Sequence, residues 1–187
     1  MIDWENADVP LLHVEQARGR VPLLREKCLG EDFGHAMRHE HGCPLAAYRA
    51  AVDPLISEIN EVEQSLRAMA VGSTGRATGE NLAAACQVLD GRLTAVLVQL
   101  DAMDPPRKLR AMHADMRTAV DLRLRACQRI AAGWQIEREA SFEAAQSAYL
   151  EAEALLSEAR MLLVAVGAVL SEVDVALDSV GARSPTA

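Results

Sequence analysis

Apolar residues recur at alternating steps of three and four along four long stretches of this chain, and this repeat constrains the fold more than any other feature. A 3-4 repeat places all of its members on one face of an α-helix. A helix with a single apolar face has to bury it, and four such helices can bury their faces against one another. The sequence therefore predicts an all-α protein, folded as an antiparallel up-and-down four-helix bundle of long helices. The clearest repeat consists of Leu82, Cys86, Leu89, Leu93, Val96, Leu100 and Met103.

The helix bounds follow from residues that start and stop helices. We expect Pro44 to begin the first helix, Asp104 to cap the third and Ser141 to cap the fourth. Pro54 lies inside the first helix, where its missing backbone donor predicts a kink or a short break. The glycine-rich run 72–79 is expected to be a connector, because it lacks the Gly-Lys-Ser/Thr ending of a phosphate-binding loop. The four helices are expected at residues 44–71, 78–103, 105–134 and 141–179.

The two ends of the chain differ from the predicted bundle domain, which covers residues 43–180. Residues 1–42 contain prolines and glycines at close intervals and carry no long apolar stripe. We expect this segment to be an N-terminal arm of short, irregular helices that packs on the bundle. Residues 181–187 are expected to form a disordered tail.

Composition narrows the classes of protein to which the chain can belong. The net charge of −8 at pH 7 argues against non-specific binding to nucleic acid. The longest apolar run, residues 161–170, is far shorter than the ~20 residues that a membrane span requires. The N-terminus lacks the basic and apolar segments of an export signal, and the four cysteines show no CxxC spacing. We therefore expect a cytoplasmic protein with reduced thiols and without a membrane span.

A cluster of histidines precedes the first long helix. His35 and His39 would lie one turn apart on a helix, and His41 and Cys43 follow within a few residues. Imidazole and thiolate groups at this spacing could bind one metal ion, with zinc, nickel or copper as the suitable metals. The alternative is a solvated polar turn in which these side chains bind nothing. The cluster therefore predicts a metal-binding or metal-sensing site, as an alternative to the leading function given below.

His113 and Arg123 both fall on the inward face of the third expected helix. A buried arginine needs a carboxylate partner, so the two residues could line a pocket for a small anionic ligand. The alternative, which the sequence favours, is that His113 forms a hydrogen bond across the bundle and Arg123 extends out to solvent. In that case the helix would rotate locally to bury Leu122 or Leu124 instead.

The last two expected helices carry opposite net charges. Residues 107–138 contain eight lysines and arginines against three acids, whereas residues 139–178 contain eight acids against Arg160 alone. Neighbouring helices of opposite charge are expected to pair with each other and so set their register. A sharper alternative is that this helix binds phosphates, but its basic residues are spread around it and no aromatic side chains lie among them, which disfavours nucleic acid as a partner. The basic residues concerned are Arg107, Lys108, Arg110, Arg117 and Arg125.

No catalytic constellation is evident in the sequence. The Glu-x-x-His pairs of di-iron bundles are absent, and Cys86 and Cys127 lie in apolar stripes, where they are interpreted as small hydrophobic residues. The last expected helix, however, carries two adjacent apolar stripes, which is wider than one neighbour requires. The leading hypothesis is a non-enzymatic interaction or assembly module that binds a protein partner or self-associates into a homo-oligomer. The expected interface consists of Leu156, Leu163, Leu170 and Leu177.

Trp134 lies where two long helices are expected to reverse direction. The sequence Trp134-Gln135 resembles the start of the Trp-x-Gly turn in small helical hairpin proteins exported by type VII secretion. The third position is Ile136 instead of glycine, so the motif is incomplete. The resemblance covers this turn alone; it implies a reversal near Trp134 and assigns the chain to no family.

Overall fold

The computed structural model describes residues 43–71 and 76–181, and this part of the chain is all-helical without any strand. The all-α prediction is therefore confirmed, with four helices packed together. The predicted arm at 1–42 lies outside the described residues, as does the tail beyond Gly181. The elements are α3 (Pro44–Val71), α4 (Arg76–Asp101), the 3₁₀ turn η1 (Arg107–Leu109), α5 (Arg110–Glu139) and α6 (Phe142–Gly181).

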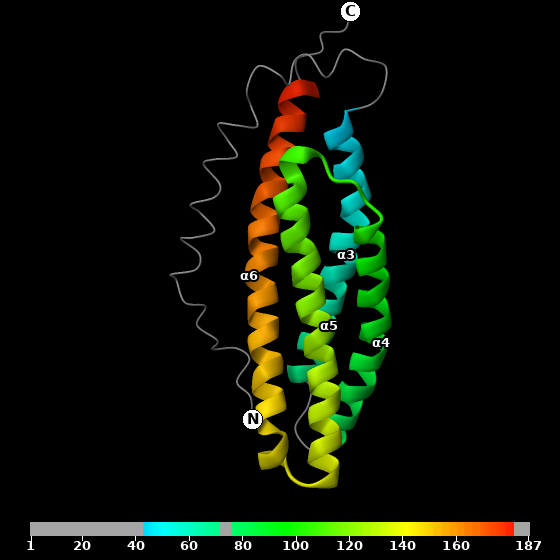
Figure 1. Ribbon diagram of the computed structural model, residues 1–187, viewed down its shortest axis with the longest axis vertical. Helices are drawn as coiled ribbons and strands as arrows, with labels where there is room; N and C mark the ends of the chain where they lie inside the picture. The colour runs from blue at the N-terminus through cyan, green and yellow to red at the C-terminus, as the bar shows by residue number, and fades with distance from the viewer. Residues whose placement is uncertain (1–42, 72–75, 182–187) are drawn as a thin grey trace, which may run out of the picture.

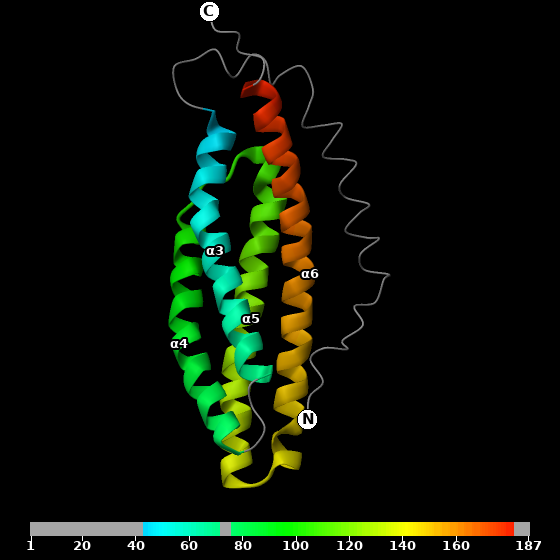
Figure 2. The ribbon, with the colours of Figure 1, turned by 180° about the vertical axis from the view of Figure 1, so that it is seen from behind.

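The four helices lie side by side along one long axis (Figure 1). α5 packs most extensively on α6 and next on α4, while α3 packs on α4 and makes few contacts with α6. From behind, α3 crosses the side of the bundle opposite α5 (Figure 2). Each helix thus has two neighbours, with α3 diagonal to α5 and α4 diagonal to α6.

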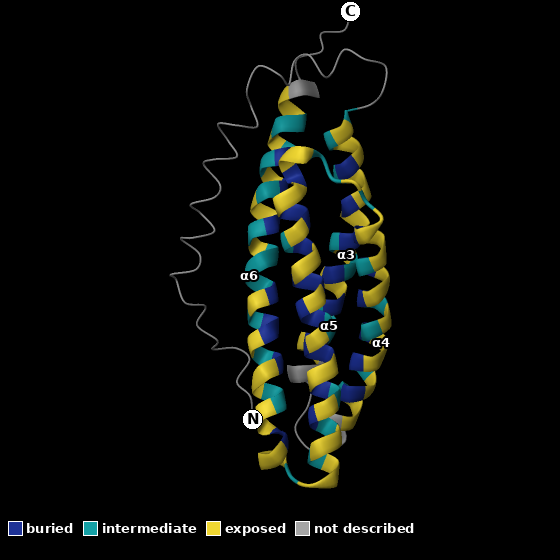
Figure 3. Ribbon diagram, in the orientation of Figure 1, coloured by how far each residue is buried: buried dark blue, intermediate teal, exposed yellow. Residues whose placement is uncertain are grey.

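Buried residues face the common interior of the four helices (Figure 3). Ala119, Ala126 and Ala159 have no exposed surface, and these small side chains let α5 and α6 approach closely. At Gly133 the approach is closer still, because a Cβ atom placed there would lie 2.7 Å from Cε1 of Tyr149. Within residues 43–71 and 76–181, no helix is long and apolar enough to cross a membrane.

The turn between α5 and α6 is later than the sequence predicts. α5 continues to Glu139, so Trp134 lies inside a helix instead of at a reversal, and the reversal implied by the Trp-x-Gly resemblance is wrong. The chain turns at Ala140 and Ser141. The Ser141 hydroxyl accepts a hydrogen bond from the Ala144 backbone N–H at 3.3 Å, which confirms Ser141 as the cap of α6.

Two other expectations concern a helix end and a helix break. Asp104 caps no helix: η1 follows Pro106 without a side-chain cap, and the Asp104 carboxylate instead lies 3.9 Å from Arg110. Pro54 does not break α3, which is continuous from Pro44 to Val71, so the predicted break is wrong and the kink stays a prediction. Pro54 and Ala50 are both exposed, so water can satisfy the Ala50 carbonyl that loses its partner.

Ion pairs join neighbouring helices. Arg129 Nε lies 3.1 Å from Glu151 Oε1, a contact between basic α5 and acidic α6 of the kind that the charge pattern predicts. Other basic residues of α5 pair elsewhere: Arg117 binds Asp101 at the end of α4, and Arg123 reaches α3. The positive charge of α5 is thus shared among its neighbours α4 and α6 and the diagonal helix α3.

Candidate functional site

His113 forms a hydrogen bond across the bundle. Its Nδ1 atom lies 2.8 Å from the Tyr48 hydroxyl of α3, and both side chains are buried. Burial raises the pKa of Tyr48 to about 12, so the phenol stays protonated near neutral pH. This contact matches the structural interpretation of His113 that the sequence favours, a hydrogen bond between helices.

Arg123 does not extend to solvent, so the sequence-based preference for an exposed side chain is wrong. The side chain is 2% exposed, and Nη2 donates a hydrogen bond to Glu63 Oε2 at 2.9 Å. Leu122 is buried as well, so no local rotation of α5 exchanges one residue for the other. The physical reason is the Glu63 carboxylate, which lies on a different helix and supplies the charge partner that a buried arginine requires.

Glu63 is the centre of a polar cluster that joins α3, α5 and α6, hereafter the Glu63 cluster. Its Oε1 atom accepts hydrogen bonds from Arg160 at 2.7 Å and from Arg67 at 2.9 Å, in addition to the contact with Arg123. Burial alone would raise the pKa of Glu63, but the Arg160 hydrogen bond and the charges of Arg123 and Arg160 lower it overall. The carboxylate is therefore ionised at neutral pH.

One atom of the Glu63 cluster lacks a partner. Nη1 of Arg123 is buried and makes no hydrogen bond within the described part of the chain. Burial lowers the pKa of Arg123, opposed by the charge and hydrogen bond of Glu63. The guanidinium remains charged, since its ordinary pKa is above 12. The cluster thus connects three helices at an electrostatic cost.

His113 and Arg123 do not converge on one pocket. Ten residues separate them on α5, which corresponds to about 15 Å along the helix axis. His113 contacts Tyr48 and Arg123 contacts Glu63, so each side chain is held by a different part of α3. The pocket for a small anionic ligand stays a prediction.

The metal cluster falls almost entirely outside the described residues, which include neither His35 nor His39 nor His41. Cys43 is described, and it is a partly exposed free thiol directly before α3. Over residues 43–71 and 76–181, no group of three or more His, Cys, Asp or Glu side chains is placed to hold a metal ion. The proposed zinc, nickel or copper site therefore stays a prediction.

The two buried cysteines lie against each other across the α4–α5 contact. Cys86 and Cys127 are both 1% exposed, as expected for residues in apolar stripes. A hydrogen bond between the two thiols raises the pKa of Cys86 and lowers that of Cys127. Both are free thiols within the hydrophobic core.

The predicted interface on α6 belongs to the core. Leu156 and Leu170 are 3% and 4% exposed, while Leu163 and Leu177 are partly buried against the same core. α6 packs extensively on α5 and makes a few further contacts with α3. Leu156 and Leu170 are therefore buried within the bundle, whereas an interface role for the partly exposed Leu163 and Leu177 stays a prediction.

A different helix presents an unpartnered surface that the sequence analysis missed. The outward side of α4 carries five uncharged residues, and Ala102 directly after the helix extends them to six at steps of 4-3-4-3-4, hereafter the α4 outward stripe. Val88 and Val98 are 68% and 64% exposed, and the other members are small and exposed. The members are Ala84, Val88, Gly91, Ala95, Val98 and Ala102. The outward stripe has the same helical period as the inward one. It was overlooked in the sequence because its alanines, glycine and valines are less hydrophobic than the leucines of the inward stripe.

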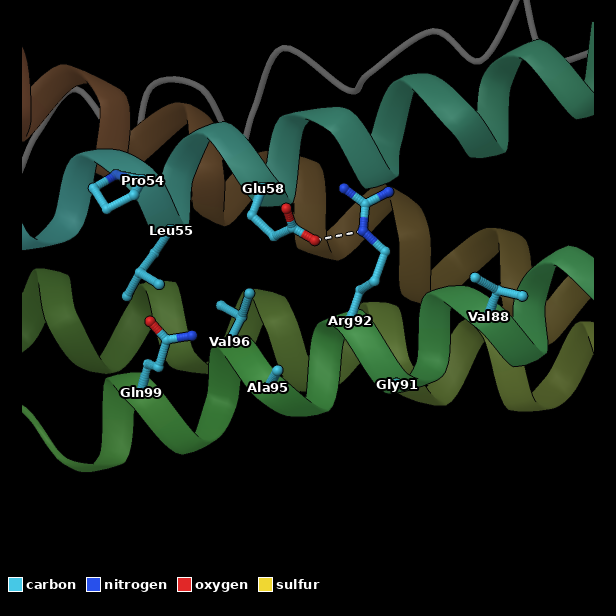
Figure 4. Close-up of a pocket in the computed structure, with 9 residues that line it drawn as sticks. All are labelled: Pro54, Leu55, Glu58, Val88, Gly91, Arg92, Ala95, Val96 and Gln99. Atoms are coloured by element: carbon cyan, nitrogen blue, oxygen red, sulfur yellow. Dashed lines mark hydrogen bonds and ion pairs between the residues drawn. The ribbon is translucent and has the colours of Figure 1, made fainter.

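An open groove of about 560 Å³ runs between α3 and α4 beside this stripe (Figure 4). An ion pair between Glu58 of α3 and Arg92 of α4 crosses the groove, and the Arg92 hydrogen bond lowers the pKa of Glu58. Gly91 also lines the groove, and a Cβ atom placed there would meet nothing within 4 Å. The remaining lining residues are Pro54, Leu55, Val88, Ala95, Val96 and Gln99.

Comparisons of the chain with protein-family models, with curated proteins and with solved structures found no match. Function therefore has to be argued from the surface chemistry of the bundle itself. The Arg123–Glu63 pair and the His113–Tyr48 contact both lie between helices, with little exposed surface. The α4 outward stripe with its groove is accessible to another molecule.

Proposed function

We propose that this protein is a non-enzymatic helical-bundle module, with its helices in antiparallel up-and-down order, that binds a protein partner through α4. The observation that carries the proposal is the uncharged, exposed outward stripe from Ala84 to Ala102. Support for the helix order comes from the connections, because the α4–α5 connection and the α5–α6 turn lie at opposite ends of the bundle (Figure 1).

The composition of the stripe is unusual for a helix surface that faces water. Solvent-facing sides of helices normally carry charged and polar residues. Charged residues make up 25% of the chain, yet none of the six positions of the stripe carries a charge. Asp101 lies at its edge and is already paired with Arg117. Exposed valines contribute little to the stability of the isolated bundle, so burial against a partner would explain them better.

Gly91 gives independent support. Glycine in the interior of a helix costs about 1 kcal/mol relative to alanine. Among the described residues, no other element lies within 4 Å of a Cβ atom placed at Gly91, so packing between α4 and its neighbours does not require glycine. A partner helix lying along α4 would benefit, because glycine and alanine allow two helix backbones to approach closely. The adjacent groove can accept side chains of that partner.

The proposal is tested by site-specific photo-crosslinking in cells that produce the full chain. A photoreactive amino acid replaces Val88 in one variant and Val164 of α6 in the other; these valines are 68% and 66% exposed. We expect covalent adducts with a protein from position 88 and none from position 164. Absence of adducts at position 88, with the variant folded, would contradict the proposed function.

A further inference from the structure

The α4 outward stripe is symmetric about position 93. Ala84 and Ala102 both lie nine residues from it, Val88 and Val98 both lie five, and Gly91 and Ala95 both lie two. The exposed neighbours Gln87 and Gln99 follow the same rule at six residues. Read in either direction from the centre, the surface presents a small residue, a valine and another small residue.

This symmetry matches the geometry of a two-fold dimer. In such a dimer the same surface of both copies meets itself, and two helices related by the axis run antiparallel. With the axis at position 93, each residue faces the one at the same distance on the other side of the centre. Val88 then faces Val98 of the second copy, and Gly91 faces Ala95. Valines meet valines and small residues meet small residues along about 27 Å of helix.

We infer that the partner bound by the α4 outward stripe is a second copy of this chain, paired antiparallel and centred on position 93. The inference rests on the proposed function, because it names the partner of the same surface. It moves the predicted self-association from α6 to α4.

Charge supports this choice of surface. Two copies with a net charge of −8 repel each other, so an uncharged contact surface lowers the cost of association. On one side of the stripe, Arg92 is paired with Glu58 and Glu61; at its C-terminal end, Asp101 is paired with Arg117. The charges of Arg92 and Asp101 beside the contact are thus already compensated within each copy.

The outward side of α6 is the main competing surface, and it fits a second copy less well. Val164 and Val175 are strongly exposed there and are themselves symmetric about a centre between 169 and 170, but the exposed Asp178 lies at the next step, so the uncharged stripe is shorter than that of α4. α6 is also rich in acids, with Glu151 and Glu158 exposed. Two copies meeting through α6 would bring like charges together.

Sedimentation equilibrium of the full, reduced protein over a wide concentration range tests the inference. A seam made of one helix with small side chains predicts a reversible dimer with a dissociation constant of the order of micromolar. Val88→Lys should weaken the dimer by at least roughly tenfold, because it places a charge in the seam. Val164→Lys is a matched control: it is equally exposed and, like Val88, lies four residues from an arginine.

A second variant tests the antiparallel register. In the double variant V88K/V98E, each lysine would face a glutamate of the second copy, so the dimer should recover relative to V88K. Positions 88 and 98 are too far apart to interact within one helix, since ten residues span about 15 Å. A parallel pairing would instead bring lysine against lysine. Circular dichroism checks that every variant keeps its helical content.

Three outcomes would overturn the inference: a monomer at all concentrations, a dimer weakened by V164K but not by V88K, or no recovery in V88K/V98E. A monomer whose position 88 still crosslinks to another protein in cells would leave the proposed function in place and remove only the second copy. A monomer without such adducts would remove both. Adducts from position 88 to residues 1–42 of the same chain would assign the stripe to the N-terminal arm.

Discussion

Substitution of Glu63 by glutamine should destabilise the bundle far more than substitution of its buried partner Arg123 by methionine. The two residues form one ion pair, but their surroundings differ. Arg123 is 2% exposed and has Glu63 as its acidic partner, whereas Glu63 is also bound by Arg160 and Arg67. Glu63→Gln therefore leaves the Arg123 guanidinium in place, whereas Arg123→Met leaves the Glu63 carboxylate with its two other arginines.

Glu63→Gln leaves the Arg123 guanidinium buried without a counter-charge. Breaking a buried pair in this way costs about 3–5 kcal/mol. For a domain of this size, 1 kcal/mol shifts the melting temperature by about 2–4 °C, so we expect a loss of roughly 6–20 °C. Such a loss is a large part of a typical total stability of about 5–15 kcal/mol.

Arg123→Met removes the buried charge itself. Glu63 keeps Arg160 and Arg67, whose side chains are 27% and 61% exposed and can be hydrated. The substitution also removes Nη1, the buried atom that has no partner among the described residues. We expect the free energy of unfolding to stay within about 1 kcal/mol of the original protein, because replacing buried ionic groups by apolar ones is often close to neutral.

Urea unfolding followed by circular dichroism at pH 7 measures both effects. Glu61→Gln is a suitable control, since the Glu61 side chain is 64% exposed and its pair with Arg92 should contribute less than about 1 kcal/mol. The reasoning is refuted if Arg123→Met costs as much as Glu63→Gln. That result would mean that the Arg123 guanidinium is a net source of stability.

Three further outcomes are expected. The lowered pKa of Glu63 means that its ionised form stabilises the fold at pH values above its ordinary pKa of 4.5. This stabilisation is lost as the pH falls through the pKa of Glu63 in the folded state. Urea unfolding at a series of pH values should therefore show a smaller acid-induced loss of unfolding free energy for Glu63→Gln than for the original protein. Gly133→Ala should destabilise the fold by about 1–2 kcal/mol, because the new methyl group meets the Tyr149 ring. Gly91→Ala should stabilise the isolated chain by about 0.5–1 kcal/mol, because alanine favours a helix more than glycine does. Thermal melts at low concentration measure both variants, and a higher melting temperature for Gly133→Ala than for Gly91→Ala would contradict this reasoning. If the His35 cluster binds metal, mass spectrometry of the untagged protein should find near-stoichiometric zinc, nickel or copper. The double variant His35→Ala with His39→Ala should lose this metal. A metal-free protein that retains none of these ions after incubation with them would count against the site.

The local sequence determined the helices of this protein. Apolar residues at steps of three and four are sufficient to predict where helices form and which side is buried, because both depend on neighbours within one or two turns. The inward stripe of α4 and the capping of α6 by Ser141 were predicted for this reason, and both are confirmed. The later end of α5 was missed, because no glycine or proline marks the turn at Ala140.

Only the tertiary structure decided what each helix face contacts. Periodicity placed Arg123 on the inward side, but whether it stays there depended on Glu63, sixty residues away on another helix. The wide stripe of α6 was equally consistent with a second neighbour or with another molecule, and the packed bundle buries Leu156 and Leu170 in the core. The outward stripe of α4 became visible once its neighbours left Val88 and Val98 uncovered. Helix formation is set by nearby residues, whereas burial and pairing depend on which distant helix comes to lie alongside.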